Sequence, residues 1–395
     1  MAKRSNKKTR SNKRAGGAEG ALPALSSLTD LPAFGELKAS DAQRSAFADA
    51  CRRACEAAGD DIAAELALGC VVRLDRGFPA VLCDDGVFRA EFSTRLTKGG
   101  LRRGENSRAA VGDWVCARRP HGHDMGLIEE ILPRESDIAR WKGKARGEKQ
   151  TLAANVDVVL VVQQLGERGA DCERIARSAV IARDCGAEVA VVLTKADRAT
   201  DEEIADDVAG VREVLGAGCA LALTSSAAVG DEERRVRASA ERLDVPWGVV
   251  AVRGLVPAGR VAIVLGESGA GKSTLLNALL GHEALETGAV REVDDMGRHT
   301  TVARRMVSLP GAGVIVDEPG LRSLPIVGHE RGLAKVFPDI AEAAGECRFR
   351  DCTHTHEPGC GVLAAGFSEV RLACYLALAA EMRESAASLD PDVVI

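Results

Sequence analysis

The most chemically informative residues of this chain lie between Gly266 and Thr274, where the sequence is GESGAGKST. This segment matches the pattern G-x-x-x-x-G-K-S/T, with an apolar run before it and a helical pattern after it, which is the context that the motif requires. Glycines let backbone N–H groups surround phosphate oxygens, and the start of the helix adds a partial positive charge. We therefore expect Lys272 to contact the β- and γ-phosphates of a nucleotide and Ser273 to bind Mg²⁺. The predicted loop comprises Gly266, Glu267, Ser268, Gly269, Ala270, Gly271, Lys272, Ser273 and Thr274.

A second group of candidate phosphate-site residues follows this loop. The apolar run VIVD ends at Asp317, and a carboxylate at the end of a buried strand can bind Mg²⁺, often through water. Gly320 leaves its backbone N–H free for the γ-phosphate. A switch segment needs a threonine whose hydroxyl and carbonyl join Mg²⁺ and that phosphate. In GRHTT, both Thr300 and Thr301 qualify, and we favour Thr301.

The segment VVLTKAD, which ends at Asp197, has the form of a guanine-recognition motif at the end of an apolar strand. In α/β sheets, ligands bind at the carboxyl ends of strands. Asp197 would accept hydrogen bonds from guanine N1 and N2, Lys195 would lie along the ring, and a second strand end would flank the base. Adenine would be rejected because it leaves such polar groups unpaired. The predicted base-site residues are Thr194, Lys195, Ala196, Asp197, Ser225 and Ser226.

The order of these motifs along the chain is unusual. The base motif precedes the phosphate loop, which is followed by the candidate switch segments. This is a rotated GTPase order, and rotation can preserve a site because domain termini usually lie close together at the surface. The second switch segment then leads directly into a C-terminal region, to which nucleotide-dependent movement could be passed.

A Cys/His cluster lies near the C-terminus in the sequence CRFRDCTHTHEPGC. Three thiolates and one imidazole match a closed structural zinc site. The cysteines are Cys347, Cys352 and Cys360, and either His354 or His356 supplies a fourth donor. Because such a set leaves no ligand position open, we expect the metal to stabilise a small domain rather than catalyse a reaction.

Several elements must position these residues. Helical spacing runs over residues 40–67, with Ser40 or Asp41 as N-cap. Five short β-rich runs between Gly69 and Leu132 predict a small barrel, most simply an OB-fold. Alternating apolar runs and helical patterns then predict an α/β domain. We predict a basic disordered tail at 1–20, a helical extension at 21–65, the barrel at 66–133, a linker at 134–150, the nucleotide domain at 151–335 and a zinc-binding domain with helices at 336–395.

Composition restricts the class of protein. The 395 residues are 46% hydrophobic and 28% charged, as expected for ordinary globular domains. No apolar run reaches the roughly 18 residues of a membrane helix, so we expect no membrane association and a cytoplasmic location. We expect most of the 12 cysteines to be reduced and buried. Seven Lys/Arg and no acidic residue fall within residues 1–14. That tail is either a solvated end or a contact for RNA or DNA.

Taken together, the motifs resemble the RsgA (YjeQ) family of circularly permuted GTPases, bacterial factors of late 30S ribosomal subunit assembly. The resemblance spans roughly residues 66–380 and includes VGDWV, TKAD, GESGAGKSTLLNAL, GRHTT, DEPGL and the Cys/His cluster. It implies a monomer that binds the 30S subunit and its 16S rRNA and hydrolyses GTP to GDP and phosphate. The resemblance further implies that the subunit stimulates this hydrolysis, which times release of the protein. It also implies zinc bound through His354 and a catalytic water oriented by His299. Two positions depart from the family pattern: Thr194 replaces Asn, and Glu318 replaces Thr.

Two other function classes fit parts of the sequence. One is an ATP-dependent enzyme or kinase in which TKAD occurs by chance. The other is a nucleic-acid-binding module whose nucleotide site is inactive, and the intact Lys272, Ser273 and Asp317 argue against it.

Overall fold

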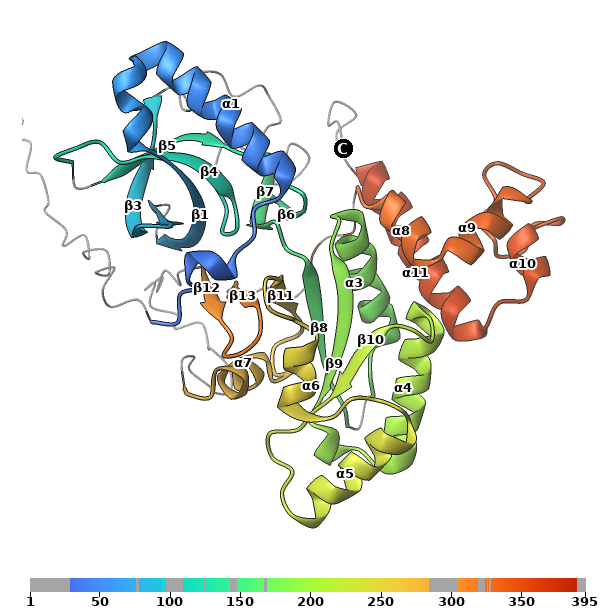
Figure 1. Ribbon diagram of the computed structural model, residues 1–395. Coiled ribbons are helices and arrows are strands. Elements are labelled where there is room, and N and C mark those ends of the chain that lie inside the picture. The colour runs from blue at the N-terminus through green and yellow to red at the C-terminus, as the bar shows by residue number, and fades with distance from the viewer. Residues whose placement is uncertain are drawn as a thin grey trace, which may run out of the picture.

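The computed structural model describes residues 29–75, 78–94, 96, 109–123, 125–142, 148–166, 169–283, 304–318, 324, 326 and 328–388. It contains a barrel, a central sheet covered by helices, and a C-terminal group of helices (Figure 1). The barrel lies on one side of the sheet and the C-terminal helices on the other (Figure 1). This arrangement confirms the predicted multidomain fold class.

Five strands form the predicted barrel, and all but one of their pairings are antiparallel. They pair in the order β1-β2-β3-β5-β4, and an additional β1–β4 pairing closes the barrel. Val71, Val81 and Ile128 are fully buried inside it. Closure also needs close packing at Gly126, where a Cβ would lie 2.3 Å from the ring of Phe88. The strands are β1 (Leu66–Asp75), β2 (Phe78–Cys83), β3 (Gly86–Phe92), β4 (Trp114–Arg118) and β5 (Gly126–Ile131).

The central sheet has the order β10-β9-β8-β11-β13-β12. All neighbouring pairs are parallel except β12–β13. The apolar runs form its middle strands because a parallel sheet is buried on both faces, and Leu160, Val192 and Ile263 have no exposed surface. The strands are β8 (Val158–Gln164), β9 (Glu188–Thr194), β10 (Ala220–Leu223), β11 (Val261–Leu265), β12 (Arg304–Ser308) and β13 (Val314–Asp317).

Helices connect the parallel strands and cover the sheet (Figure 1). Capping side chains begin two of them: Asp171 accepts from the backbone N–H of Arg174, and Thr200 accepts from that of Glu203. Such bonds satisfy donors that the first helical turn leaves unpaired. The helices are α3 (Cys172–Asp184), α4 (Asp201–Leu215), α5 (Asp231–Arg242), α6 (Gly248–Gly254) and α7 (Lys272–Leu280).

The barrel and the central sheet share one continuous ladder of strands. Strand β1 pairs with β12, with Arg73 opposite Arg305 and Leu74 opposite Arg304. Because β12 also pairs with β13, backbone hydrogen bonds connect the barrel to the strand that ends at Asp317. The barrel is therefore attached directly to the sheet that positions the candidate site.

The N-terminal helix α1 (Asp41–Ala58) packs on the barrel. Ser40 is its N-cap, one of the two residues that the sequence indicates, and it accepts from the N–H of Gln43 at 3.2 Å. The prediction of a helix over 40–67 is too long. The helix ends at Ala58 because Gly59 has a φ of 97°; residues 60–65 then form a 3₁₀ turn, and β1 begins.

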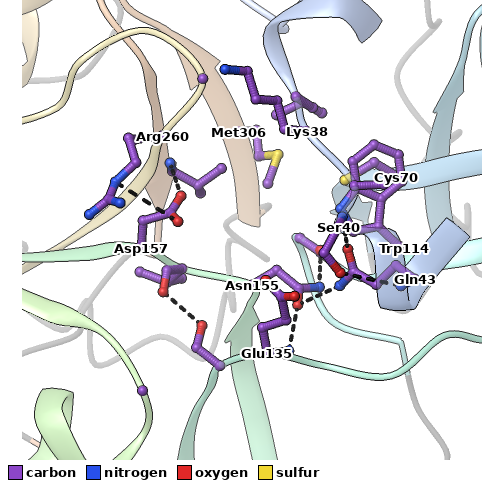
Figure 2. Close-up of a pocket in the computed structure, with 18 of the residues that line it drawn as sticks. Lys38, Ser40, Gln43, Cys70, Trp114, Glu135, Asn155, Asp157, Arg260 and Met306 are labelled. Atoms are coloured by element: carbon purple, nitrogen blue, oxygen red, sulfur yellow. Dashed lines mark hydrogen bonds and ion pairs between the residues drawn. The ribbon is translucent and has the colours of Figure 1, made fainter.

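A cavity of about 350 Å³ lies where α1, the barrel and the sheet meet (Figure 2). Its wall includes Gln43 beside α1's cap, Trp114 of the barrel, and Asp157 and Arg260 at the amino ends of sheet strands. The amide of Gln43 donates to the side chain of Asn155 and to the carbonyl of Pro133, both at 3.0 Å. These bonds join the N-terminal segment to the junction of barrel and sheet.

The predicted linker at 134–150 contains regular structure. Strands β6 (Asp137–Lys142) and β7 (Glu148–Ala154) form a separate two-stranded sheet. The guanidinium of Arg134, at the start of this segment, donates to the fully buried carboxylate of Asp113 at 2.7 and 2.8 Å. It also donates to the hydroxyl of Thr151 at 2.6 Å. The charge is therefore paired inside the protein.

The C-terminal helices pack against α3. The ring of Phe337 is fully buried between them, and the guanidinium of Arg177 on α3 binds the carboxylate of Glu381. His329 Nδ1 lies 2.8 Å from an oxygen of Asp184. Within the described residues, none of the helices has the length and apolar character to cross a membrane. The helices are α8 (Glu330–Val336), α9 (Pro338–Gly345), α10 (Gly361–Ala365) and α11 (Glu369–Ser388).

Candidate nucleotide site and metal site

The predicted phosphate loop connects β11 to α7 at the carboxyl edge of the sheet. It begins against β8, where a Cβ on Gly266 would lie 2.5 Å from the carbonyl oxygen of Val162. Gly269 and Gly271 have φ values of 84° and 87°, which favour glycine because other residues are strained there. The glycines thus allow the loop both its tight turn and its close approach to the sheet.

Lys272 is the first residue of α7, and its side chain folds back over the loop. Its Nζ donates to the carbonyls of Gly266 and Glu267, each at 2.6 Å. The ammonium is therefore at the mouth of the loop, where the phosphates of a nucleotide would compete for its protons. Ser273 follows and is partly buried, whereas Thr274 is exposed.

Asp317 lies at the same edge of the sheet as the phosphate loop. Val316 is in register with Ile263 of β11, so Asp317 ends its strand just before the loop begins on the neighbouring one. Arg305 on β12 has its Nε 3.8 Å from the Asp317 carboxylate. The next residue, Glu318, is paired with Arg304 at 2.6 Å. The glutamate at this position thus has a cation beside it on the adjacent strand.

The base motif occupies the carboxyl end of β9, two strands away from the phosphate loop. Lys195 has a φ of 56° and turns the chain into a 3₁₀ segment, η4 (Ala196–Arg198). The carboxylate of Asp197 accepts a hydrogen bond from the Ser225 hydroxyl, which follows β10. Ser226 is exposed beside it. Both predicted strand ends therefore meet, with Asp197 and Ser225 in direct contact.

Two side chains connect the base motif to the phosphate loop. The Thr194 hydroxyl donates to the carbonyl of Ala270 at 2.7 Å. Lys195 Nζ donates to the carbonyl of Gly269 and, at 2.6 Å, to the side chain of Gln164. Burial lowers the pKa of Lys195, and the nearby Arg198 lowers it further. Segments about 75 residues apart therefore form one site.

Several predicted residues lie outside the part of the chain that the structure describes. They are the catalytic candidate His299, the switch threonines Thr300 and Thr301, and Gly320. Their roles stay predictions.

Sequence reasoning missed three contributors to the site. Strand β12 was not predicted, and its two arginines face Asp317 and Glu318. Gln164 contacts Lys195. The sequence indicates this residue only weakly, because two glutamines end an otherwise apolar run where a strand is expected to end. No sequence signal marks the two arginines as site residues, because their partners depend on the pairing of β12 with β13.

The Cys/His cluster forms a compact set of donors. One donor atom each from Cys347, Cys352, His354 and Cys360 lies within 4.8 Å of the others. The His354 Nδ1 is 3.5 Å from the sulfurs of both Cys347 and Cys360, and those sulfurs are 3.8 Å apart. These separations match those between ligands around a tetrahedral zinc ion with bonds of about 2.0–2.3 Å.

The two histidines of this segment have different environments. His354 is 8% exposed, its backbone φ is 60°, and its Nδ1 lies in the cluster. Burial lowers the pKa of His354, which favours the neutral imidazole that binds metals. His356 is exposed, and its Nδ1 lies 2.8 Å from the Thr355 hydroxyl. The donor set of three thiols and one buried imidazole fits zinc, with His354 as the nearer histidine.

Comparisons with known proteins give one consistent result. The family model for the RsgA GTPase matches residues 131–242 and 243–327. A small ribosomal subunit biogenesis GTPase RsgA from Streptomyces coelicolor is 41% identical over 326 residues, covering 82% of each chain. A protein of the same name from Leptospira interrogans is 34% identical over 321 residues, covering 80% of this chain and 82% of its own.

Two solved structures have the same fold. YjeQ from Thermotoga maritima has a TM-score of 0.57 at 21% identity, covering 80% of this chain and 99% of its own. YloQ, described as a circularly permuted GTPase, has a TM-score of 0.52 at 22% identity, covering 81% and 96%. The resemblance that the motifs predict is confirmed. This chain belongs to the RsgA GTPase family.

Proposed function

We propose that this chain hydrolyses GTP to GDP and phosphate in the biogenesis of the small ribosomal subunit. One observation carries the enzymatic part: the side chains of Thr194 and Lys195 bond directly to the phosphate loop, so one nucleotide can contact both motifs. The names of relatives with 34–41% identity over most of the chain support the biological part.

The proposed phosphate chemistry follows from the residues at the loop. Lys272 binds the β- and γ-phosphates, and Ser273, Thr301 and Asp317 hold Mg²⁺, which neutralises charge on the phosphates. The backbone N–H of Gly320 contacts the γ-phosphate. A water molecule attacks the γ-phosphorus, and the bond from that phosphorus to the β–γ bridging oxygen breaks, releasing GDP and phosphate.

We assign the orientation of the catalytic water to His299, as the family resemblance implies. The residue after Gly320 is the apolar Leu321, which cannot orient water. A neutral imidazole can accept a hydrogen bond from the attacking water. Guanine selectivity is assigned to Asp197, whose carboxylate accepts from the base, with Ser225 and Ser226 beside the base.

The Cys/His cluster is proposed to bind one structural zinc ion through Cys347, Cys352, His354 and Cys360. The spacing of the four donors supports this assignment. A zinc with four protein ligands has no open position for substrate. Its role is then to stabilise the turns between α9 and α11.

The proposed partners are the 30S subunit and its 16S rRNA, contacted by a monomer in the cytoplasm. Seven cationic side chains within residues 1–14 support an RNA contact, because each neutralised phosphate releases condensed counterions. Binding of the subunit would order the switch residues, and hydrolysis would time release.

Hydrolysis of GTP by the purified chain, alone and with isolated 30S or 50S subunits, tests this function. We expect 30S subunits to raise turnover at least about tenfold, since partners that complete a GTPase site raise rates by much more than this. The 50S subunit is the control and should have little effect. His299→Ala should remove most of the stimulated rate.

Three outcomes separate the parts of the proposal. Hydrolysis that 30S subunits do not stimulate would contradict the ribosomal role while leaving the enzyme intact. Absence of GTP hydrolysis under all conditions would contradict the enzymatic role. An unchanged stimulated rate in His299→Ala would remove the assignment of the catalytic water.

A further inference from the structure

The side chain of Thr194 lies under the phosphate loop rather than beside the base. It is 5% exposed, and its hydroxyl oxygen is 2.7 Å from the carbonyl oxygen of Ala270 and 3.2 Å from that of Gln163. A threonine hydroxyl has a single proton to donate. The shorter contact therefore marks Ala270 as its main acceptor, and the hydroxyl has no proton left for a base.

The position of this bond fixes one peptide plane of the loop. In a trans peptide, the carbonyl of one residue and the N–H of the next point in opposite directions. When Thr194 binds the carbonyl of Ala270 from the side of β8 and β9, the N–H of Gly271 must point away from those strands. A Cβ on Gly271 would lie 3.7 Å from the Thr194 oxygen, so the Thr194 side chain lies beside Gly271 without crowding it.

Lys195 contributes to the same arrangement one residue earlier in the loop. Its Nζ bonds to the carbonyl of Gly269, so two successive loop carbonyls are bound by two successive residues of the base motif. Asp197, by contrast, has no bond to the loop among its described contacts, and it accepts from Ser225 across the base site. Thr194 thus contacts the phosphate loop, whereas Asp197 contacts the segment that follows β10.

We propose that Thr194 is a positioning residue for the phosphate loop and takes no part in recognising the base. Its hydroxyl orients the Ala270–Gly271 peptide so that the Gly271 N–H faces the phosphates. This inference rests on the proposed function, since it assumes that the loop binds the phosphates of a guanine nucleotide. Thr194 then contributes to the affinity for the nucleotide, whereas Asp197 determines the selectivity for guanine.

Thr194→Val tests the proposal because it keeps the shape of the side chain and removes the hydroxyl. The measurement is the affinity of the full chain for GDP and for IDP, which lacks the exocyclic amino group of guanine. We expect Thr194→Val to weaken both nucleotides about tenfold, or 1.4 kcal/mol, with an unchanged GDP-to-IDP ratio. Thr194→Ser, which keeps the hydroxyl, should restore most of the affinity.

Asp197→Asn provides the contrasting variant, and it should change the GDP-to-IDP ratio. Unchanged GDP affinity in Thr194→Val, or a changed ratio, would overturn the positioning role. If Thr194→Val does not fold, as judged by circular dichroism, Thr194→Ala carries the same expectation. Failure of the wild-type chain to prefer GDP over ADP would instead contradict the proposed function, so the two failures are distinguishable.

Discussion

The nucleotide site and the Cys/His cluster are built in opposite ways. The nucleotide site gathers residues from strand ends that are far apart in the sequence, and Thr194 and Ala270 meet across 76 positions. The cluster gathers its donors from 14 consecutive residues, Cys347 to Cys360. The first site depends on the order of strands in the sheet, whereas the second depends on local turns and on the ion that joins them.

This difference has consequences for stability. The residues around the phosphate loop pack against a large core, in which Val162, Leu279 and Ile315 are fully buried. The turns that carry the cluster have short helices on either side, α9 with eight residues and α10 with five. Metal binding to such turns is itself folding free energy. We therefore expect the nucleotide site to keep its structure when no nucleotide is bound. We expect the cluster region to lose its structure when the metal is removed.

The largest expected effect comes from Lys272→Ala. Removing the ammonium should lower GTP hydrolysis about a hundredfold or more, because loss of one group that stabilises developing charge costs about 3 kcal/mol. Zinc content and the thermal unfolding midpoint should not change. Lys38→Ala, which removes an exposed lysine at the junction cavity, is the matched control. Equal activity in the two variants would mean that the loop does not act as assigned.

Cys360→Ser removes one ligand of the Cys/His cluster and should leave the nucleotide site intact. The sulfur of Cys360 is a cluster donor and also accepts from the N–H of Leu363 at the start of α10, a role that a serine hydroxyl can keep. We expect zinc content to fall from about one ion per chain, and the C-terminal helices to melt at lower temperature, with GDP affinity nearly unchanged.

His356→Ala is the control for that experiment, since this exposed histidine lies outside the cluster. It should keep its zinc. Loss of zinc from His356→Ala but not from Cys360→Ser would contradict the ligand set. Absence of zinc from the wild-type chain, measured by elemental analysis, would contradict the metal site as a whole.

The sequence predicts the local parts of this molecule well. Runs such as VVLVV and VAIVL have the continuous apolar character of buried parallel strands, and they form β8 and β11. The N-cap at Ser40 and the barrel strands are also confirmed. In each case, the signal lies within one element, where periodicity and capping chemistry act.

The parts that sequence reasoning missed depend on pairing between distant elements. Strand β12 has the sequence RRMVS, and its two arginines interrupt the apolar pattern expected of a strand. They are tolerated because Arg304 pairs with Glu318 and Arg305 lies near Asp317 on β13. The segment predicted as a linker contains β6 and β7, which pair with each other, and Arg134 just before β6 pairs with Asp113 of the barrel. Such partners follow from strand order, which motifs alone do not give.

We propose that two segments in permuted order form a single guanine-nucleotide site. Equilibrium titration of the full chain with mant-GDP and with mant-ADP, in the presence of Mg²⁺, tests it most directly. We expect GDP to bind more than about a hundredfold tighter, because adenine leaves the polar groups of the base site unpaired. Equal or tighter binding of mant-ADP would contradict the claim.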